Sequence, residues 1–165
     1  MKNLEQWRKE IDKFLLVELS KRPLKSIVDI GLGDSSGSIK KTGRPFDIID
    51  KIRHTNLQSI ECDILRADSL PSKRWDIVVC CEVFEHIENP FIAAANIYSL
   101  LTDSGVILVT VPCNLEHHPG LPWYGDFWRF MPGSIACLFP NRKVTEYVKY
   151  SNSPNFPYGI CAVIS

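Results

Sequence analysis

The stretch Ser26-Ile-Val-Asp-Ile-Gly-Leu-Gly-Asp34 decides the fold. Its apolar run breaks at Gly31 and Gly33, as a buried parallel strand does when it ends in a tight turn beneath a ligand. Glycine suits such a turn, because a Cβ would disfavour positive φ and hold a ligand away from the backbone. A lone Gly-x-Gly also occurs in ordinary strand-to-helix turns, so the residues downstream must decide its meaning.

Around this stretch the composition is that of a globular protein. The chain has 165 residues, 45% of them hydrophobic and 23% charged, which is enough for one domain with its own core. The formal net charge is zero, so nothing global attracts nucleic acid or a membrane surface. No nucleic-acid or membrane partner is therefore indicated. The small size of the domain favours a small-molecule substrate, and the sequence leaves the oligomeric state open.

The start of the chain and its cysteines predict the cellular compartment of the protein. The start, Met1 to Glu5, lacks the long apolar core of a signal peptide, and no apolar run is long enough to span a bilayer. None of the six cysteines has metal-ligand spacing, and most lie in apolar runs. We expect them to be small buried hydrophobes in a reducing compartment, which predicts a cytoplasmic protein without a metal site.

The order of elements predicts an α/β fold. An amphipathic helix over residues 3–20 belongs to an N-terminal segment 1–24 that packs on a domain spanning 25–165. Within that domain the predicted strands cover 25–30, 46–50, 57–65, 75–81, 106–111, 144–150 and 158–164. A short helix falls within 34–43, a longer one runs from Asn89-Pro90 to Gly105, and another covers 133–139 at the end of a long loop. Seven residues separate the last two strands, too few for a helical crossover, so these should pair antiparallel.

Acidic side chains follow several of these strands. Ligands of open parallel sheets sit beyond the carboxyl ends of the strands. Asp50 ends the second strand at nearly the spacing of about 20 residues at which a ribose-binding carboxylate follows a glycine turn. Asp63, or alternatively Asp68, could accept a hydrogen bond from an adenine amino group. The fourth strand runs into Cys81-Glu-Val-Phe-Glu-His86.

Together these elements resemble class I S-adenosylmethionine-dependent methyltransferases, most closely the small domains with a Glu-His element after the fourth strand. The resemblance rests on the glycine turn, on Asp50, and on three longer stretches: Trp75-Asp-Ile-Val-Val-Cys-Cys-Glu-Val-Phe-Glu-His-Ile-Glu-Asn-Pro90, Ser99-Leu-Leu-Thr-Asp-Ser-Gly-Val-Ile-Leu-Val-Thr-Val-Pro112 and Gly125-Asp-Phe-Trp-Arg-Phe-Met-Pro132. It implies a single three-layer Rossmann-like domain whose seven-stranded sheet is mostly parallel, with an antiparallel C-terminal strand.

The resemblance also implies a cofactor and the residues that bind it. S-adenosylmethionine would be held at its methionine part by Asp29, Gly31 and Gly33, at its ribose by Asp50, and at its adenine by Asp63 or Asp68. Glu82 would lie beside the sulfonium. Two departures concern cofactor affinity. Ser35 stands where the family has a third glycine, and the helix after the second strand is essentially missing.

Four side chains are candidates for the base that an acceptor hydroxyl would need: His86, His117, His118 and Asp126. His86 could instead orient its loop, and the other two histidines could be solvated. Trp123 and Tyr124 are candidates for a substrate pocket, whereas Trp128 is predicted to pack. Arg129 could clamp an anionic substrate or pair with a core carboxylate such as Glu85.

The predicted function is therefore methyl transfer from S-adenosylmethionine to an unidentified acceptor, expected to be a small molecule or a sugar-like group. One alternative is a methyltransferase-like binding module that has lost cofactor affinity, which the abbreviated glycine helix and Ser35 motivate. Another is a nucleotide-dependent oxidoreductase, although Ser36 stands where the dinucleotide fingerprint has its third glycine.

Overall fold

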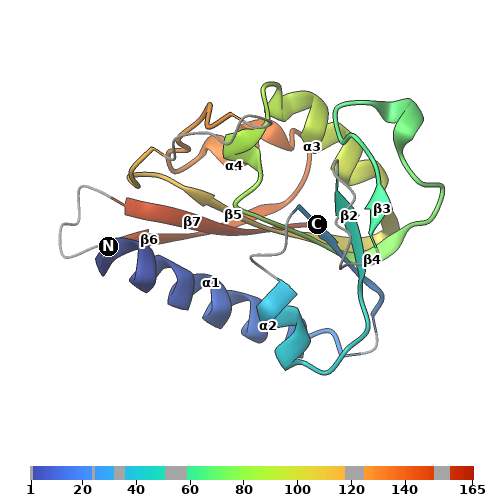
Figure 1. Ribbon diagram of the computed structural model, residues 1–165, viewed down its shortest axis with the longest axis horizontal. Helices are drawn as coiled ribbons and strands as arrows, with labels where there is room; N and C mark the ends of the chain where they lie inside the picture. The colour runs from blue at the N-terminus through green and yellow to red at the C-terminus, as the bar shows by residue number, and fades with distance from the viewer. Residues whose placement is uncertain (1, 24, 32–35, 51–58, 118–124, 151–156) are drawn as a thin grey trace.

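One twisted sheet with helices on both faces forms the protein (Figure 1). The computed structural model describes residues 2–23, 25–31, 36–50, 59–117, 125–150 and 157–165. Over these residues the sheet has seven strands in the order β3-β2-β1-β4-β5-β7-β6. Their bounds are Ile27–Ile30 for β1, Asp47–Asp50 for β2, Ile60–Glu61 for β3, Trp75–Cys81 for β4, Leu101–Pro112 for β5, Val144–Tyr150 for β6 and Pro157–Ile164 for β7.

The strand pairing matches the predicted Rossmann-like architecture. β1 pairs in parallel with β2 and β4, β2 with β3, and β4 with β5. β7 runs antiparallel to both of its neighbours, β5 and β6. The prediction of a mostly parallel sheet with an antiparallel C-terminal strand is confirmed. The strand order reverses at β1 and β4, which is where ligands of such sheets bind.

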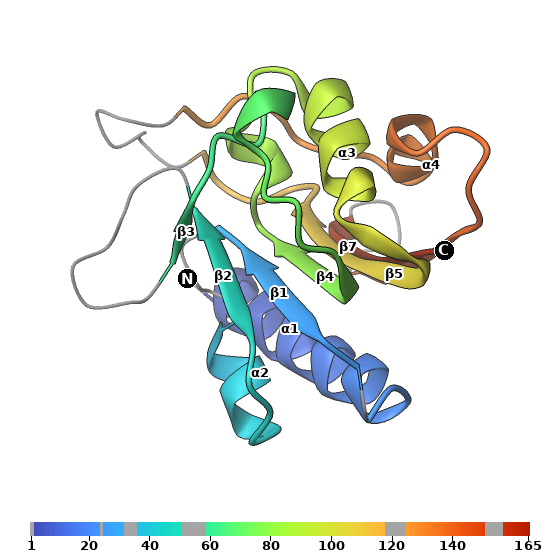
Figure 2. The ribbon, with the colours of Figure 1, turned by 90° about the vertical axis from the view of Figure 1, so that its right-hand side faces the viewer.

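The helices cover the sheet in two layers (Figure 2). α1 (Lys2–Ser20) and α2 (Ser36–Lys41) lie on one face, and α3 (Pro90–Ser99) and α4 (Ser134–Leu138) on the other, with short 3-10 turns at Ala67–Ser69 and Phe84–His86. The predicted amphipathic spacing of α1 places its buried side chains on the sheet: Trp7, Ile11, Phe14, Leu15 and Leu19. The opposite face buries a second apolar cluster that includes Trp75, Phe84 and Ile97.

The start of β5 differs from the prediction. The helix predicted to end at Gly105 ends at Ser99, and the strand begins at Leu101, five residues before the predicted start. Leu101 is buried and pairs with Trp75, so burial against the sheet outweighs helical continuation. Gly105 instead lies where the register slips, and a Cβ there would come within 2.9 Å of the Leu101 side chain and 3.0 Å of the Thr102 carbonyl.

The structure confirms one smaller prediction, corrects a second and bears out a third only in part. Asn89 caps α3 by accepting a hydrogen bond from the Ile92 amide at 3.2 Å, with Pro90 at the first helical position, as predicted. The third strand, predicted over residues 57–65, ends at Glu61 instead of Leu65. Five cysteines are buried as free thiols, but Cys137 is exposed on α4, contrary to the prediction.

Over the residues that the structure covers, none of the helices combines the length and apolar character needed to cross a membrane.

Candidate active site

A cavity of about 540 Å³ opens at the carboxyl ends of β1, β2 and β4. Its size falls in the range of about 300–1,000 Å³ that is usual for small-molecule sites. The lining residues come from the strand ends and from the segments that follow them: Ile30, Gly31, Ile49, Asp50, Cys62, Asp63, Ile64, Leu65, Val83, His86, Ile87, Glu88, Gly125 and Phe127. The cavity therefore combines apolar walls with a few polar groups, as cofactor sites do.

Gly31 shapes the floor of this cavity at the end of β1. Its amide donates a hydrogen bond to the Ile49 carbonyl at 2.9 Å, which holds the turn against β2. Its φ of +99° lies in the left-handed region, and a Cβ would approach the Val83 side chain to 2.8 Å. The position thus requires glycine for its backbone conformation and for the close packing of the loop after β4.

The carboxylates predicted to bind the adenosyl group lie on two neighbouring segments. Asp50 ends β2 and Asp63 follows β3, and both line the cavity. Asp63 also organises its turn, because its Oδ1 accepts the Leu65 amide at 3.1 Å. Asp68, the alternative to Asp63, is 71% exposed and forms an ion pair with Arg66 at 2.8 Å. The cavity brings Asp50 and Asp63 together and leaves Asp68 on the surface.

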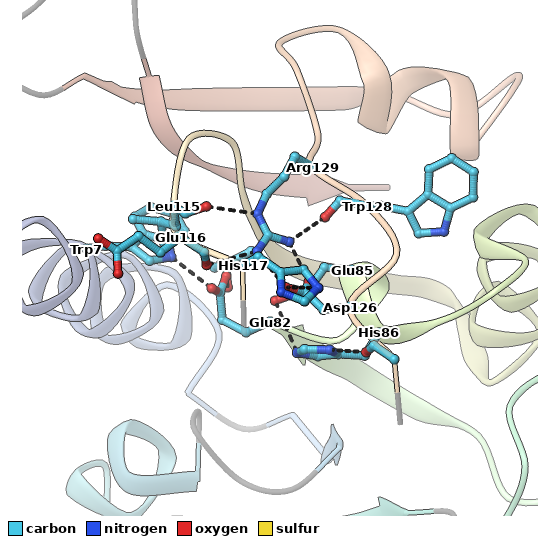
Figure 3. A network of polar contacts seen from close by, with 12 residues as sticks. Trp7, Glu82, Glu85, His86, Leu115, Glu116, His117, Asp126, Trp128 and Arg129 are labelled. Atoms are coloured by element: carbon cyan, nitrogen blue, oxygen red, sulfur yellow. Dashed lines mark hydrogen bonds and ion pairs between the residues drawn. The ribbon is translucent and has the colours of Figure 1, made fainter. Parts of the chain in front are cut away.

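The remaining predicted cofactor residues are placed differently. Asp29 is fully buried within β1, two residues before Gly31. Glu82 directly follows β4 with a φ of +54°. Its Oε2 accepts a hydrogen bond from Trp7 Nε1 at 2.9 Å, and its Oε1 accepts one from Thr110 Oγ1 at 3.1 Å (Figure 3). Gly33 lies outside the described residues.

A buried ion pair occupies the centre of a polar network (Figure 3). Arg129 binds both oxygens of Asp126, with Nη2 at 2.7 Å from Oδ2, and the Asp126 side chain is fully buried. Arg129 also donates to the carbonyls of Leu115 and Glu116, at 3.1 and 3.0 Å. The hydrogen bonds that Arg129 donates to Asp126 raise the pKa of the guanidinium. The predicted pairing of Arg129 with a core carboxylate is therefore present, but its partner is Asp126 instead of Glu85.

The four candidate bases fall in different surroundings. His86 lines the cavity, and its Nδ1 lies 2.7 Å from the Gly125 carbonyl. Because a carbonyl only accepts, this contact requires the proton on Nδ1. His117 is 69% exposed, with Nε2 3.9 Å from Asp126. His118, together with the predicted pocket residues Trp123 and Tyr124, lies outside the residues that the structure describes.

The segment that carries Asp126 and Arg129 is hydrogen-bonded to the turn after β4. The Glu85 carbonyl accepts the Phe127 amide at 2.7 Å, and the Ile87 carbonyl accepts Trp128 Nε1 at 2.8 Å. The bond from Trp128 agrees with its predicted packing role, although 42% of this residue is exposed. These contacts hold one wall of the cavity, because Gly125 and Phe127 line it.

Glu85 is a buried acid that the sequence did not single out for chemistry. Its Oε1 lies 3.8 Å from His86 Nε2, and its buried Oε2 has no hydrogen-bond partner among the residues that the structure covers. Burial, reinforced by the nearby Glu82, raises the pKa of the Glu85 carboxyl well above its usual range. The sequence signal was the pair Glu85-His86 directly after the predicted fourth strand.

Replacing Glu85 by glutamine is expected to remove a pH-dependent loss of stability. Above the ordinary glutamate pKa of about 4.3 the unfolded chain releases this proton while the folded protein keeps it, so stability falls as pH rises. The melting-temperature difference between Glu85→Gln and the wild type should therefore be larger, in favour of the variant, at pH 8 than at pH 4. Glu88→Gln, at an exposed position, controls for the lost charge. An equal difference at both pH values would contradict the prediction.

Comparison with known proteins adds to this geometry. Residues 2–152 match the model of a family described as a methyltransferase domain. Among curated proteins, no match was found. A SAM-dependent methyltransferase from Archaeoglobus fulgidus superimposes with a TM-score of 0.65 at 14% identity, over 93% of each chain.

Two other solved structures are similar. The 1,6-didemethyltoxoflavin-N1-methyltransferase of Burkholderia thailandensis, with 1,6-didemethyltoxoflavin and S-adenosylhomocysteine bound, has a TM-score of 0.68 at 14% identity, over 95% of this chain and 76% of that one. The N-methyltransferase NodS of Bradyrhizobium japonicum WM9, in complex with S-adenosylhomocysteine, has a TM-score of 0.66 at 15% identity, over 95% and 85%. At these identities the likeness shows a shared fold.

Proposed function

Because this chain belongs to the methyltransferase domain family and has the class I S-adenosylmethionine-dependent fold, we propose that it methylates a small-molecule or sugar-like acceptor. The observation that carries the proposal is the cavity at the strand ends, with Gly31 at its floor and Asp50 and Asp63 in its walls. The similar Burkholderia enzyme has the small molecule 1,6-didemethyltoxoflavin bound, which supports the class of acceptor.

The residues of the cavity fit an adenosyl group. Gly31 lines the cavity without a side chain and so allows close approach of a ligand to the backbone. Asp50 offers carboxylate oxygens for ribose hydroxyls, and Asp63 can accept from an adenine amino group. Ile30, Ile49 and Leu65 supply apolar surface for a purine ring. When bound, S-adenosylmethionine supplies an activated methyl group on a sulfonium.

The protein's own contribution to catalysis is alignment and charge. Holding an acceptor in line with the methyl carbon can replace about 7–11 kcal/mol of entropic and solvent cost. If the acceptor is a hydroxyl, a base adds roughly 10²–10⁴-fold. His86 suits this role better than Asp126, because His86 lines the cavity whereas the Asp126 carboxylate is buried and bound to Arg129. A proton on Nδ1 leaves Nε2 of the neutral ring as the basic nitrogen.

The proposal is tested by calorimetry with S-adenosylmethionine, S-adenosylhomocysteine and NADH. We expect the first two to bind and NADH not to bind. Asp50→Ala should raise the dissociation constant of S-adenosylhomocysteine about 5- to 150-fold, since it removes hydrogen bonds worth about 1–3 kcal/mol. Asp68→Ala serves as the control, because this carboxylate is exposed and paired with Arg66.

Other outcomes would favour another function or another adenosyl site. No binding of either sulfur compound at millimolar concentration would favour a binding module without cofactor affinity. Selective binding of NADH would favour an oxidoreductase. Loss of affinity in Asp68→Ala but not in Asp50→Ala would contradict the cavity as the adenosyl site.

A further inference from the structure

We propose that Trp7, on the N-terminal helix α1, is a positioning residue for methyl transfer, because its indole N–H orients the Glu82 carboxylate at the end of β4. The inference rests on the proposed function. It gives α1 a role beyond covering one face of the sheet, since this helix reaches the carboxyl ends of the strands through Trp7 (Figure 3).

The indole of Trp7 has little freedom to move. The side chain is fully buried, and its ring makes an edge contact with Tyr158 at 5.9 Å between centroids. A Cβ on Gly159 would lie 2.5 Å from the indole, so the ring packs directly on the backbone of β7. Since Gly159 pairs with Pro112, this packing lies at the carboxyl end of β5. The direction of the N–H is therefore set by tertiary packing.

Glu82 is constrained from two sides. Each carboxylate oxygen accepts one hydrogen bond, Oε2 from Trp7 on α1 and Oε1 from Thr110 on β5. The Glu82 amide also donates to the Thr110 carbonyl at 3.0 Å, and its φ of +54° is uncommon for a residue with a side chain. Such a conformation persists only where the surroundings over-determine it, and such residues cluster at functional sites.

The consequence is a negative charge fixed in space at the edge where the cavity opens. Glu82 stands directly before Val83, which lines the cavity. Methyl transfer from a sulfonium removes positive charge, so a fixed carboxylate distinguishes the charged cofactor from its neutral product. A carboxylate held in advance interacts more strongly with a cation than one that must be ordered on binding. Trp7 therefore acts on ligand selectivity through Glu82.

The chain contains a matched control for this contact. Trp75 is also fully buried, and its Nε1 donates to Asp47 Oδ2 at 2.6 Å. This second indole–carboxylate bond joins the first residues of β4 and β2, at the opposite end of the strands from the cavity. Phenylalanine at either position removes one indole N–H and keeps an aromatic ring.

The test compares Trp7→Phe with Trp75→Phe by calorimetry with S-adenosylmethionine and S-adenosylhomocysteine. Trp7→Phe should weaken S-adenosylmethionine binding about 3- to 30-fold, which is less than the roughly 10- to 150-fold effect of a lost hydrogen bond made directly to a charged ligand, because Trp7 acts through Glu82. S-adenosylhomocysteine binding should be weakened less. Trp75→Phe should leave both affinities unchanged. In a Glu82→Ala background, Trp7→Phe should have no further effect on affinity, because the partner through which it acts is gone.

A second variant covers the case in which Trp7→Phe does not fold. Thr110→Val removes the hydroxyl that donates to Glu82 Oε1, at nearly constant shape, and should also lower the preference for S-adenosylmethionine. Equal loss of both ligands, or the same loss in Trp75→Phe, would overturn the inference while leaving the proposed function intact. A wild-type protein that binds neither ligand would overturn the proposed function, and the inference with it.

Discussion

Replacing Arg129 by methionine is expected to lower the free energy of unfolding by about 3–5 kcal/mol, the usual effect of removing one partner from a buried ion pair. The guanidinium holds both oxygens of Asp126, whose side chain is fully buried, and without it that charge loses the cation that binds both of its oxygens. The same substitution removes the donors to the Leu115 and Glu116 carbonyls. Urea denaturation of the variant and the wild type measures the difference.

The reciprocal variant provides the control. Asp126→Asn should cost less, because the Arg129 side chain is 24% exposed and can keep part of its hydration. The double variant Asp126→Asn, Arg129→Met should be more stable than Arg129→Met alone, since it leaves no carboxylate charge at the buried position 126. A double variant less stable than Arg129→Met would contradict this account of the network.

Replacing Gly31 by alanine is expected to destabilise the fold by about 2–5 kcal/mol and to abolish cofactor binding. A residue with a Cβ at φ +99° is strained by about 1–2 kcal/mol, and overpacking against Val83 adds about 1–3 kcal/mol. The substitution also alters the lining of the cavity, because Gly31 and Val83 both line it. Thermal unfolding and calorimetry with S-adenosylhomocysteine measure the two effects.

Two variants separate strain from crowding at this turn. Gly43→Ala also places a Cβ at positive φ, +68°, but has nothing within 4 Å, so it should show the conformational cost alone. Val83→Ala should restore part of the stability of Gly31→Ala, because it removes the methyl group that the new Cβ meets. If Gly43→Ala is as destabilising as Gly31→Ala, crowding at Gly31 is unimportant.

The periodicity of apolar residues was sufficient to predict the layers of the fold. The three- and four-residue steps from Trp7 to Leu19 predict α1, and the unbroken apolar run through Val79 predicts the central strand. The glycine turn and Asp50 marked the cavity, because the carboxyl ends of parallel strands meet at one edge of the sheet. These features depend on local sequence and on the rules of strand crossover.

What escaped prediction depends on partners distant in sequence. Nothing near Glu82 indicates that its carboxylate binds an indole 75 residues earlier in the chain. Arg129 was assigned Glu85 as a candidate partner, whereas Asp126 binds it from three positions away within an irregular segment. The early start of β5 also required knowledge that Leu101 would be buried beside Trp75. Each of these points depends on contacts between particular side chains. The periodicity of apolar residues carries no information about such contacts.

The insertion of β7 between β5 and β6 has a consequence for biosynthesis. β6 leaves the ribosome before β7, yet it cannot join β5 directly, because β7 is the strand that separates them. Until β7 arrives, one edge of β5 is unpaired, and Trp7 lacks the backbone of Gly159 on which it rests. Until this late strand docks, a nascent chain presents the unpaired edge of β5, and an unpaired edge strand is prone to pairing with other chains.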